Sequence, residues 1–284
     1  MAKSDYRLQT EIACGPDTVH SLACSEVWGG NNVVDLNVEV PGFMSWVHSR
    51  PLQPATLGGD VYYLAVCSKG LLSRIVLADV AGHGEAVSAT AETLRNLLRK
   101  HMNALDQAVL MQEINEAFRR KDDPPDAVYA TAAVLGYFCK TGELVFANAG
   151  HPAPLWYHAR ENTWDWLHED TSYKQSRMEG VPLGLIPGTE YIQSAVQLGP
   201  ADLLILYTDG ISEATNEAGE ELGYEGLLQL ARSVPSQTTN TPGTMGRALL
   251  SEVSAFRGDS PAMDDQTLVV LQQTTTNMAA YASR

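Results

Sequence analysis

The spacing of apolar and polar residues predicts many short strands along this chain. Apolar runs, or apolar residues at every second position, occur over residues 35–40, 43–49, 61–67, 74–78, 129–139, 143–147, 154–157, 191–198, 203–208 and 266–271. Such segments are typical of strands that bury one or both of their faces. Lys140-Thr141-Gly142 lies between two of them and predicts a hairpin.

Directly after Gly84 the apolar spacing changes from that of a strand to that of a helix. Apolar residues at helical spacing occur over residues 85–102, 105–120, 227–234 and 245–256. Two pairs of amphipathic helices among antiparallel strands predict an α+β fold, because each pair must cover the face of a sheet.

The chain is expected to form one domain, because no repeat, low-complexity linker or change of composition divides it. We expect this domain over residues 31–273, followed by a polar tail over residues 274–284. Residues 1–30 are weakly patterned and predict a lead-in that could hold a short helix. Residues 158–181 are polar with scattered aromatic side chains, so we expect a surface excursion where partner contacts or mobility would concentrate.

The charge of the chain restricts the partners that it could bind. A formal net charge of −15 argues against nucleic acid and against anionic membranes. The same charge favours divalent cations, although solubility alone would account for most of the excess.

The four cysteines do not form a metal motif or a disulfide framework. Cys14, Cys24, Cys67 and Cys139 contain no Cys-x-x-Cys pair, and two of them lie in apolar, strand-like runs. The first residues lack the apolar segment of a signal peptide, and no stretch reaches the roughly 20 apolar residues of a membrane span. These observations predict a soluble, cytoplasmic protein with reduced thiols.

Aspartates at strand ends are the candidate chemistry of this chain. They occur in Gly58-Gly59-Asp60, Asp79-Val80-Ala81-Gly82-His83-Gly84, Thr208-Asp209-Gly210 and Asp264-Asp265-Gln266-Thr267. A single Asp-Gly pair is usually a turn. Four such strand ends together predict a site for a hard cation, since Mg²⁺ and Mn²⁺ prefer carboxylate, carbonyl and water oxygens.

These motifs, together with Asn148-Ala149-Gly150-His151-Pro152 and Pro182-Leu183-Gly184, resemble the metal-dependent protein phosphatases of the PPM family. More narrowly, the chain is similar to the bacterial branch typified by the stage II sporulation phosphatase (SpoIIE) and the stress-response sigma-regulator phosphatases. The resemblance runs in order from about residue 44 to residue 272. It implies an αββα sandwich, in which two antiparallel sheets are flanked by helix pairs.

The resemblance also implies two Mn²⁺ or Mg²⁺ ions at one end of the sandwich. Asp60 would bridge both ions, Asp79 and the Val80 backbone carbonyl would bind one, and Asp209 and Asp264 would complete the other. Asp265 is the alternative to Asp264, because the sequence does not tell which of two adjacent carboxylates points inward. His83 could act as a general acid or form structural hydrogen bonds near the site. His151 could be catalytic or could fix a turn at the end of a sheet.

Paired cations would activate a water molecule to attack a phosphate ester, so no protein nucleophile is needed. In agreement, the chain has no Cys-x₅-Arg loop, Gly-x-Ser-x-Gly elbow or Walker phosphate loop. The resemblance implies a phosphoserine or phosphothreonine protein as substrate, for example an anti-sigma-factor antagonist in a partner-switching system.

Two other functions stay open at this point: a metal-dependent hydrolase of small phosphoesters, and a non-catalytic binding module with the same fold. Regulation would come from a separate regulatory protein, from a homodimer, or from movement of the helix over residues 85–102.

Overall fold

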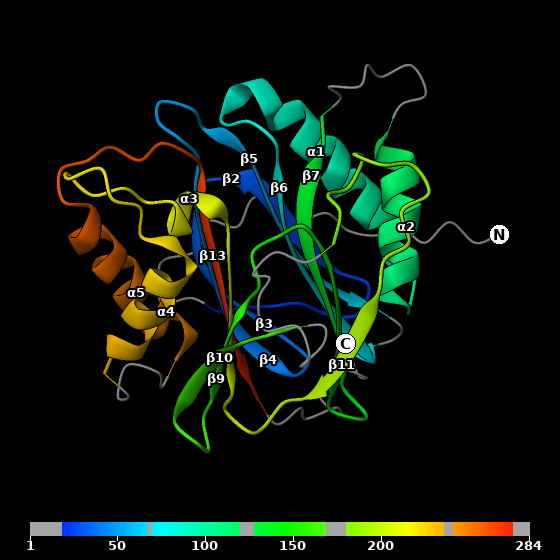
Figure 1. The fold of residues 1–284 in the computed structure, drawn as a ribbon. Helices are drawn as coiled ribbons and strands as arrows, with labels where there is room; N and C mark the ends of the chain where they lie inside the picture. Colours follow the sequence, from blue (N-terminus) through cyan, green and yellow to red (C-terminus); the bar gives the residue numbers. More distant parts are fainter. Residues whose placement is uncertain (1–18, 68–69, 120–127, 169–179, 236–240, 275–284) are drawn as a thin grey trace.

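The computed structural model describes residues 19–67, 70–119, 128–168, 180–235 and 241–274, which form two stacked sheets (Figure 1). One sheet has seven strands in the order β1 (Val19–Ser21), β3 (Val34–Val40), β4 (Phe43–Arg50), β13 (Gln266–Gln273), β12 (Leu203–Tyr207), β9 (Leu155–His158) and β10 (Thr163–Trp166). The other has six strands in the order β11 (Gln193–Gln197), β8 (Glu143–Ala149), β7 (Ala130–Phe138), β6 (Leu72–Val80), β5 (Leu57–Cys67) and β2 (Val27–Asn32).

Helices cover the outer face of each sheet. The six-stranded sheet is covered by α1 (Glu85–Lys100) and α2 (Gln107–Phe118), and the seven-stranded sheet by α4 (Gly223–Ser233) and α5 (Pro242–Arg257) (Figure 1). A four-residue helix, α3 (Asp209–Ser212), follows β12. The predicted αββα sandwich is therefore confirmed. One detail differs from the expected antiparallel sheets, because β1 pairs with β3 in parallel.

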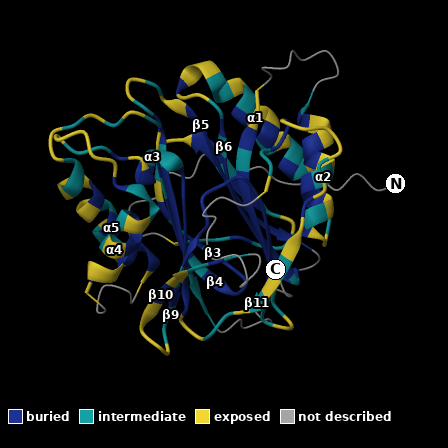
Figure 2. Ribbon diagram, in the orientation of Figure 1, coloured by how far each residue is buried: buried dark blue, intermediate teal, exposed yellow. Residues whose placement is uncertain are grey.

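Three apolar layers hold the sandwich together. The central strands β5, β6 and β12 are almost entirely buried, whereas the edge strand β11 is partly exposed (Figure 2). One layer joins α1 and α2 to the six-stranded sheet, a second lies between the sheets, and a third joins α4 and α5 to the seven-stranded sheet. The middle layer includes Leu77 of β6 and Ala133 of β7, which identifies the face of each strand that points between the sheets.

The expected lead-in over residues 1–30 contributes to both sheets where it is described. Residues 19–30 contain β1 and most of β2 and hold no helix; residues 1–18 lie outside the described part. The strand β2 escaped prediction because Gly29 and Gly30 weaken its apolar pattern. Gly29 is needed there, since an added Cβ would lie 2.5 Å from the Tyr62 carbonyl oxygen of β5.

The expected surface excursion over residues 158–181 also contains a strand. Residues Thr163–Trp166 form β10, which pairs with β9 as a hairpin, and Trp164 packs in the layer beneath α4. The middle of the excursion, residues 169–179, lies outside the described residues. None of the helices in the described ranges is long and apolar enough to cross a membrane.

Candidate active site

Neighbouring strands bring two of the predicted aspartates side by side. Asp60 of β5 is the register partner of Asp79 of β6, and Asp79 is the register partner of Thr131 of β7. Register partners in an antiparallel sheet point to the same face. Leu77 and Ala133, two residues along each strand, lie in the layer between the sheets. The side chains of this row therefore point between the sheets at one end of the sandwich.

The end of β12 supplies the opposing wall of the site. The Thr208 hydroxyl donates a 2.8 Å hydrogen bond to Asp60 Oδ2, and the Thr267 backbone N–H donates a 3.0 Å bond to Thr208 Oγ1. Both threonines are fully buried. The hydrogen bond between Thr208 and Asp60 joins the two sheets beneath the carboxylates. Because Asp209 directly follows Thr208, the same contact brings Asp209 close to Asp60.

Adjacent aspartates before β13 have different environments. Asp265 is 2% exposed, and its oxygens accept backbone N–H bonds from Leu52 (2.6 Å), Gly59 (2.6 Å) and Gly84 (3.2 Å). Asp264 is half-buried and accepts one bond, of 2.7 Å, from the Asp265 N–H. Since backbone donors occupy both oxygens of Asp265, the geometry favours Asp264 as the candidate ligand.

Burial, together with the charges of neighbouring carboxylates, makes this cluster of carboxylates difficult to ionise. Burial, followed by the neighbouring charges of Asp265 and Asp209, raises the pKa of Asp60 well above its ordinary value of 3.8. Burial and then the charge of Asp60 raise the pKa of Asp79 in the same way. Burial also raises the pKa of Asp209 and of Asp264. The four groups thus lie close enough to interact, and a cation would relieve their repulsion.

The donor set fits a hard divalent cation. The Val80 and Gly82 carbonyl oxygens approach Gly59 so closely that an added Cβ would lie 2.8 Å and 3.1 Å from them, beside Asp60. Across the described ranges, no three His, Cys, Asp or Glu side chains are close enough to hold an ion by themselves. An ion would therefore use one or two carboxylates, a carbonyl and water, which is the usual arrangement for Mg²⁺.

The two candidate histidines lie in different places. His83 is exposed, and it is near enough to Asp264 to oppose the rise in the pKa of that carboxyl. His151 is fully buried, which lowers its pKa to about 3, and its Nδ1 lies 2.8 Å from Thr131 Oγ1. Its backbone N–H donates to Asn148 Oδ1 (2.7 Å), and Asn148 Nδ2 donates back to the His151 carbonyl (2.9 Å). His151 therefore lies buried in a turn at the end of the sheet, which favours the turn-fixing role over direct contact with a substrate.

Sequence reasoning assigned no role to Thr131 or Thr208. Thr208 was visible within Thr208-Asp209-Gly210, but its hydrogen bond to Asp60 depends on how the two sheets face each other. Thr131 lay in a predicted strand, and only the register across three strands shows that it stands next to Asp79.

The two stacked sheets flanked by helices form a PP2C-like fold, and sequence comparison identifies the family to which it belongs. Residues 72–274, more than half of the chain, match the family described as Stage II sporulation protein E (SpoIIE). The chain therefore belongs to this family of metal-dependent serine phosphatases, as its motifs predicted.

Individual relatives are distant. "Phosphoserine phosphatase RsbU" of Bacillus subtilis (strain 168) is 21% identical over 222 residues, covering 76% of this chain and 60% of RsbU. The SiaA-PP2C domain of Pseudomonas aeruginosa superposes with a TM-score of 0.66 at 18% identity, covering 81% of this chain and 86% of that domain. RsbX in complex with magnesium gives a TM-score of 0.58 at 13% identity, covering 85% of this chain and 100% of RsbX. The two solved structures show the shared fold, and the chain spans less than two thirds of RsbU.

Proposed function

We propose that this chain is a Mg²⁺- or Mn²⁺-dependent protein serine/threonine phosphatase. The observation that carries the proposal is that four carboxylates from both sheets lie near one another at one end of the sandwich, where burial and neighbouring charges raise their pKa values. Membership of the SpoIIE family and the magnesium bound by RsbX support it.

The residues that would hold two ions are Asp60, Asp79, the Val80 carbonyl, Asp209 and Asp264. When bound, such ions lower the pKa of a coordinated water molecule and offset the charge of a phosphoryl group. Thr208 orients the Asp60 carboxylate through its hydroxyl, and the neutral His151 fixes Thr131 beside Asp79 without adding positive charge. His83, exposed beside Asp264, is the candidate to give a proton to the leaving serine or threonine oxygen.

The proposed substrate is a phosphoserine or phosphothreonine protein. RsbU is described as a phosphoserine phosphatase, and this supports a partner-switching regulator, such as an anti-sigma-factor antagonist, as the finer proposal. Nucleic acid and anionic membranes are unsuitable partners for a chain with a net charge of −15. We propose a cytoplasmic location, in keeping with the free thiols of Cys24, Cys67 and Cys139, and control by a separate regulatory protein or a homodimer.

The test is phosphate release from a phosphoserine peptide by the purified protein with Mn²⁺, with EDTA, and in variants. Asp60→Asn and Asp209→Asn should each lower kcat/KM by about a hundredfold or more, since even outer-shell changes cost about 10–100-fold. Asp202→Asn is a matched control, because Asp202 is a buried aspartate at the opposite end of β12, where it binds Trp156 Nε1. The Asp202→Asn variant should retain the turnover of the wild type.

Each alternative function predicts a different result in the same assay. Turnover that is unchanged in EDTA would overturn the metal mechanism. A preference for nucleotides or other small phosphoesters over the peptide would indicate a small-phosphoester hydrolase. Mn²⁺ binding without hydrolysis of any phosphoester would indicate a binding module.

A further inference from the structure

The strand that carries Asp60 leaves its regular pairing directly beside the site. Along β2 and β5, Gly30 pairs with Tyr62 but Asn32 pairs with Leu57, so the ladder is interrupted over residues 58–61 of β5. Bulges of this kind often lie next to functional sites because they redirect a side chain. Asp60 keeps its regular pairing with Asp79 of β6 on the other side of β5. The interruption on the β2 side leaves backbone groups beside Asp60 that need other hydrogen-bond partners.

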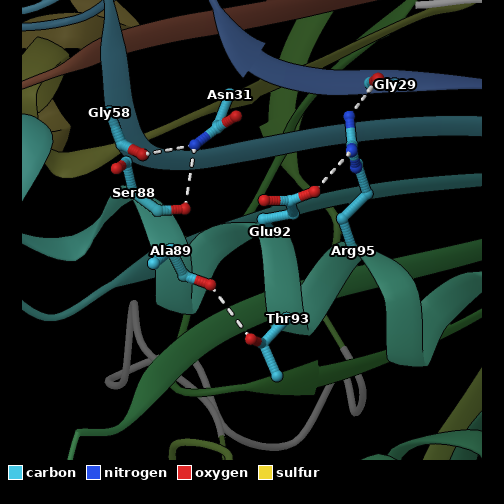
Figure 3. Close-up of polar contacts among 8 residues, drawn as sticks. All are labelled: Gly29, Asn31, Gly58, Ser88, Ala89, Glu92, Thr93 and Arg95. Carbon is cyan, nitrogen blue, oxygen red and sulfur yellow. Dashed lines mark hydrogen bonds and ion pairs between the residues drawn. The ribbon is translucent and has the colours of Figure 1, made fainter.

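Two buried side chains supply these partners. Asn31 of β2 donates through Nδ2 to the Gly58 carbonyl (2.9 Å) and to the Ser88 carbonyl of α1 (3.3 Å) (Figure 3). Asp265 accepts at Oδ2 from the Gly59 N–H (2.6 Å) and from the Gly84 N–H (3.2 Å). One side chain donates and the other accepts, so together they tie the Gly58–Gly59 backbone to both sides of the first turn of α1.

These ties leave little freedom for the backbone around Asp60. Asn31 is 7% exposed and Asp265 is 2% exposed, so water does not readily replace their hydrogen bonds. An added Cβ on Gly58 would lie 2.6 Å from Asp265 Oδ2, and one on Gly59 would lie 2.8 Å from the Val80 carbonyl oxygen. The peptide before Asp60 is thus held at close contact with both Asp265 and the loop that follows Asp79.

We propose that Asn31 and Asp265 are positioning residues for the metal centre: they set the separation between Asp60 and the Val80 carbonyl. The proposal rests on the proposed phosphatase function. Its chemical basis is that a ligand held in place before binding loses less conformational entropy when the ion arrives. Without either tie, β5 and the first turn of α1 could separate, and Asp60 would have to be ordered by the ion itself.

The chain provides a natural control for the Asn31 tie. Arg95, farther along α1, also joins this helix to β2, since its Nη1 donates to the Gly29 carbonyl (3.3 Å) (Figure 3). Its Nη2 lies 3.7 Å from Glu92 of the same helix. Arg95 therefore connects the same two elements as Asn31 but does not reach the interrupted segment.

The experiment compares Asn31→Ala, Asp265→Asn and Arg95→Ala by calorimetric titration with Mn²⁺ and by thermal unfolding in EDTA. Asn31→Ala and Asp265→Asn should weaken Mn²⁺ affinity about tenfold or more, as loss of outer-shell partners typically does. At saturating Mn²⁺ their KM for a phosphopeptide should match that of the wild type. Arg95→Ala should lower stability while leaving Mn²⁺ affinity unchanged.

Two failures can be told apart. If the wild-type protein binds no Mn²⁺, the proposed function itself fails. If the wild type binds Mn²⁺ and Asn31→Ala binds it equally well, the positioning role is overturned. Should Asp265→Asn not fold, the comparison of Asn31→Ala with Arg95→Ala decides the question alone.

Discussion

The facing carboxylates of Asp60 and Asp79 should make the metal-free protein less stable than a variant that lacks one of them. We predict that Asp79→Asn raises the melting temperature in EDTA at pH 8 while abolishing metal-dependent turnover. Asp79 is the register partner of Asp60, and like charges directly opposite each other in a sheet are destabilising. Removing the charge at Asp79 removes that repulsion but also removes a proposed metal ligand.

The expected gain in stability of Asp79→Asn follows from the pairing of Asp60 on β5 with Asp79 on β6. Side chains directly opposite on antiparallel strands have Cβ atoms about 4.5–5.5 Å apart. Two full charges about 5 Å apart repel by about 3 kcal/mol at an effective dielectric constant of about 20. Protons held by the cluster reduce this value, so we expect a gain of about 1–3 kcal/mol, or roughly 2–12 °C for a domain of this size.

The raised pKa of Asp79 also determines how the stability difference between Asp79→Asn and the wild type changes with pH. A carboxyl whose pKa is raised by folding contributes stability below its unfolded pKa and loses that contribution as pH rises through its folded pKa. The pKa of Asp79 in the folded protein is raised well above its ordinary value of 3.8. The advantage of Asp79→Asn over the wild type should therefore be small near pH 4 and should grow toward pH 8.

Thermal unfolding of the wild type, Asp79→Asn and Asp202→Asn in EDTA at several pH values tests this reasoning. Asp202→Asn should be destabilised, because Asp202 accepts hydrogen bonds from Trp156 Nε1 (3.0 Å) and from the Ala159 N–H (2.9 Å). Saturating Mn²⁺ should raise the melting temperature of the wild type more than that of Asp79→Asn, which lacks a ligand to one of the two proposed ions. If Asp79→Asn instead melts below the wild type in EDTA at pH 8, the repulsion we infer does not exist.

Three further predictions concern the surrounding structure. His151→Phe should destabilise the protein by about 1–3 kcal/mol, because Thr131 Oγ1 loses its partner. The wild type should also lose stability at this residue as pH falls from 6.5 toward 3, since burial lowers the pKa of His151 to about 3, and His151→Phe should lack that loss in a pH series of unfolding curves. Gly246→Ala should cost about 1–3 kcal/mol in denaturant unfolding, because its added Cβ would collide with the Trp46 ring. Arg74→Lys should lower the melting temperature with unchanged Mn²⁺ affinity, since lysine cannot reproduce the fork of donors that binds the two backbone carbonyls after α1.

The elements near the site were predictable because their local patterns agree with the fold. Asp60 and Asp79 lie near the ends of β5 and β6, whereas Asp209 follows β12 and Asp264 precedes β13. The glycines beside Asp60, Asp79 and Asp209 indicated that the chain turns at these places. The predicted helix over residues 85–102 corresponds to α1, which begins at Glu85 and ends at Lys100. Apolar spacing and strand ends are local properties, so a single chain reveals them.

Contacts between distant segments were not predictable in this way. The choice between Asp264 and Asp265 depends on three backbone N–H groups that come from other parts of the chain. The strand β2 carries Gly29 and Gly30, which reduce its strand signal, although close approach of β5 requires a glycine at position 29. Asn31 next to them looked like an ordinary polar residue until its two carbonyl partners were known.

The proposed metal ligands are divided between the two sheets, so metal affinity would depend on how the sheets are placed relative to each other. Asp60 and Asp79 belong to strands of one sheet, whereas Asp209 and Asp264 adjoin strands of the other. A change that slides one sheet against the other by a fraction of an ångström would alter every distance between these pairs. A ligand or protein that contacts both sheets would then change metal affinity through the apolar layer between them, without touching the carboxylates.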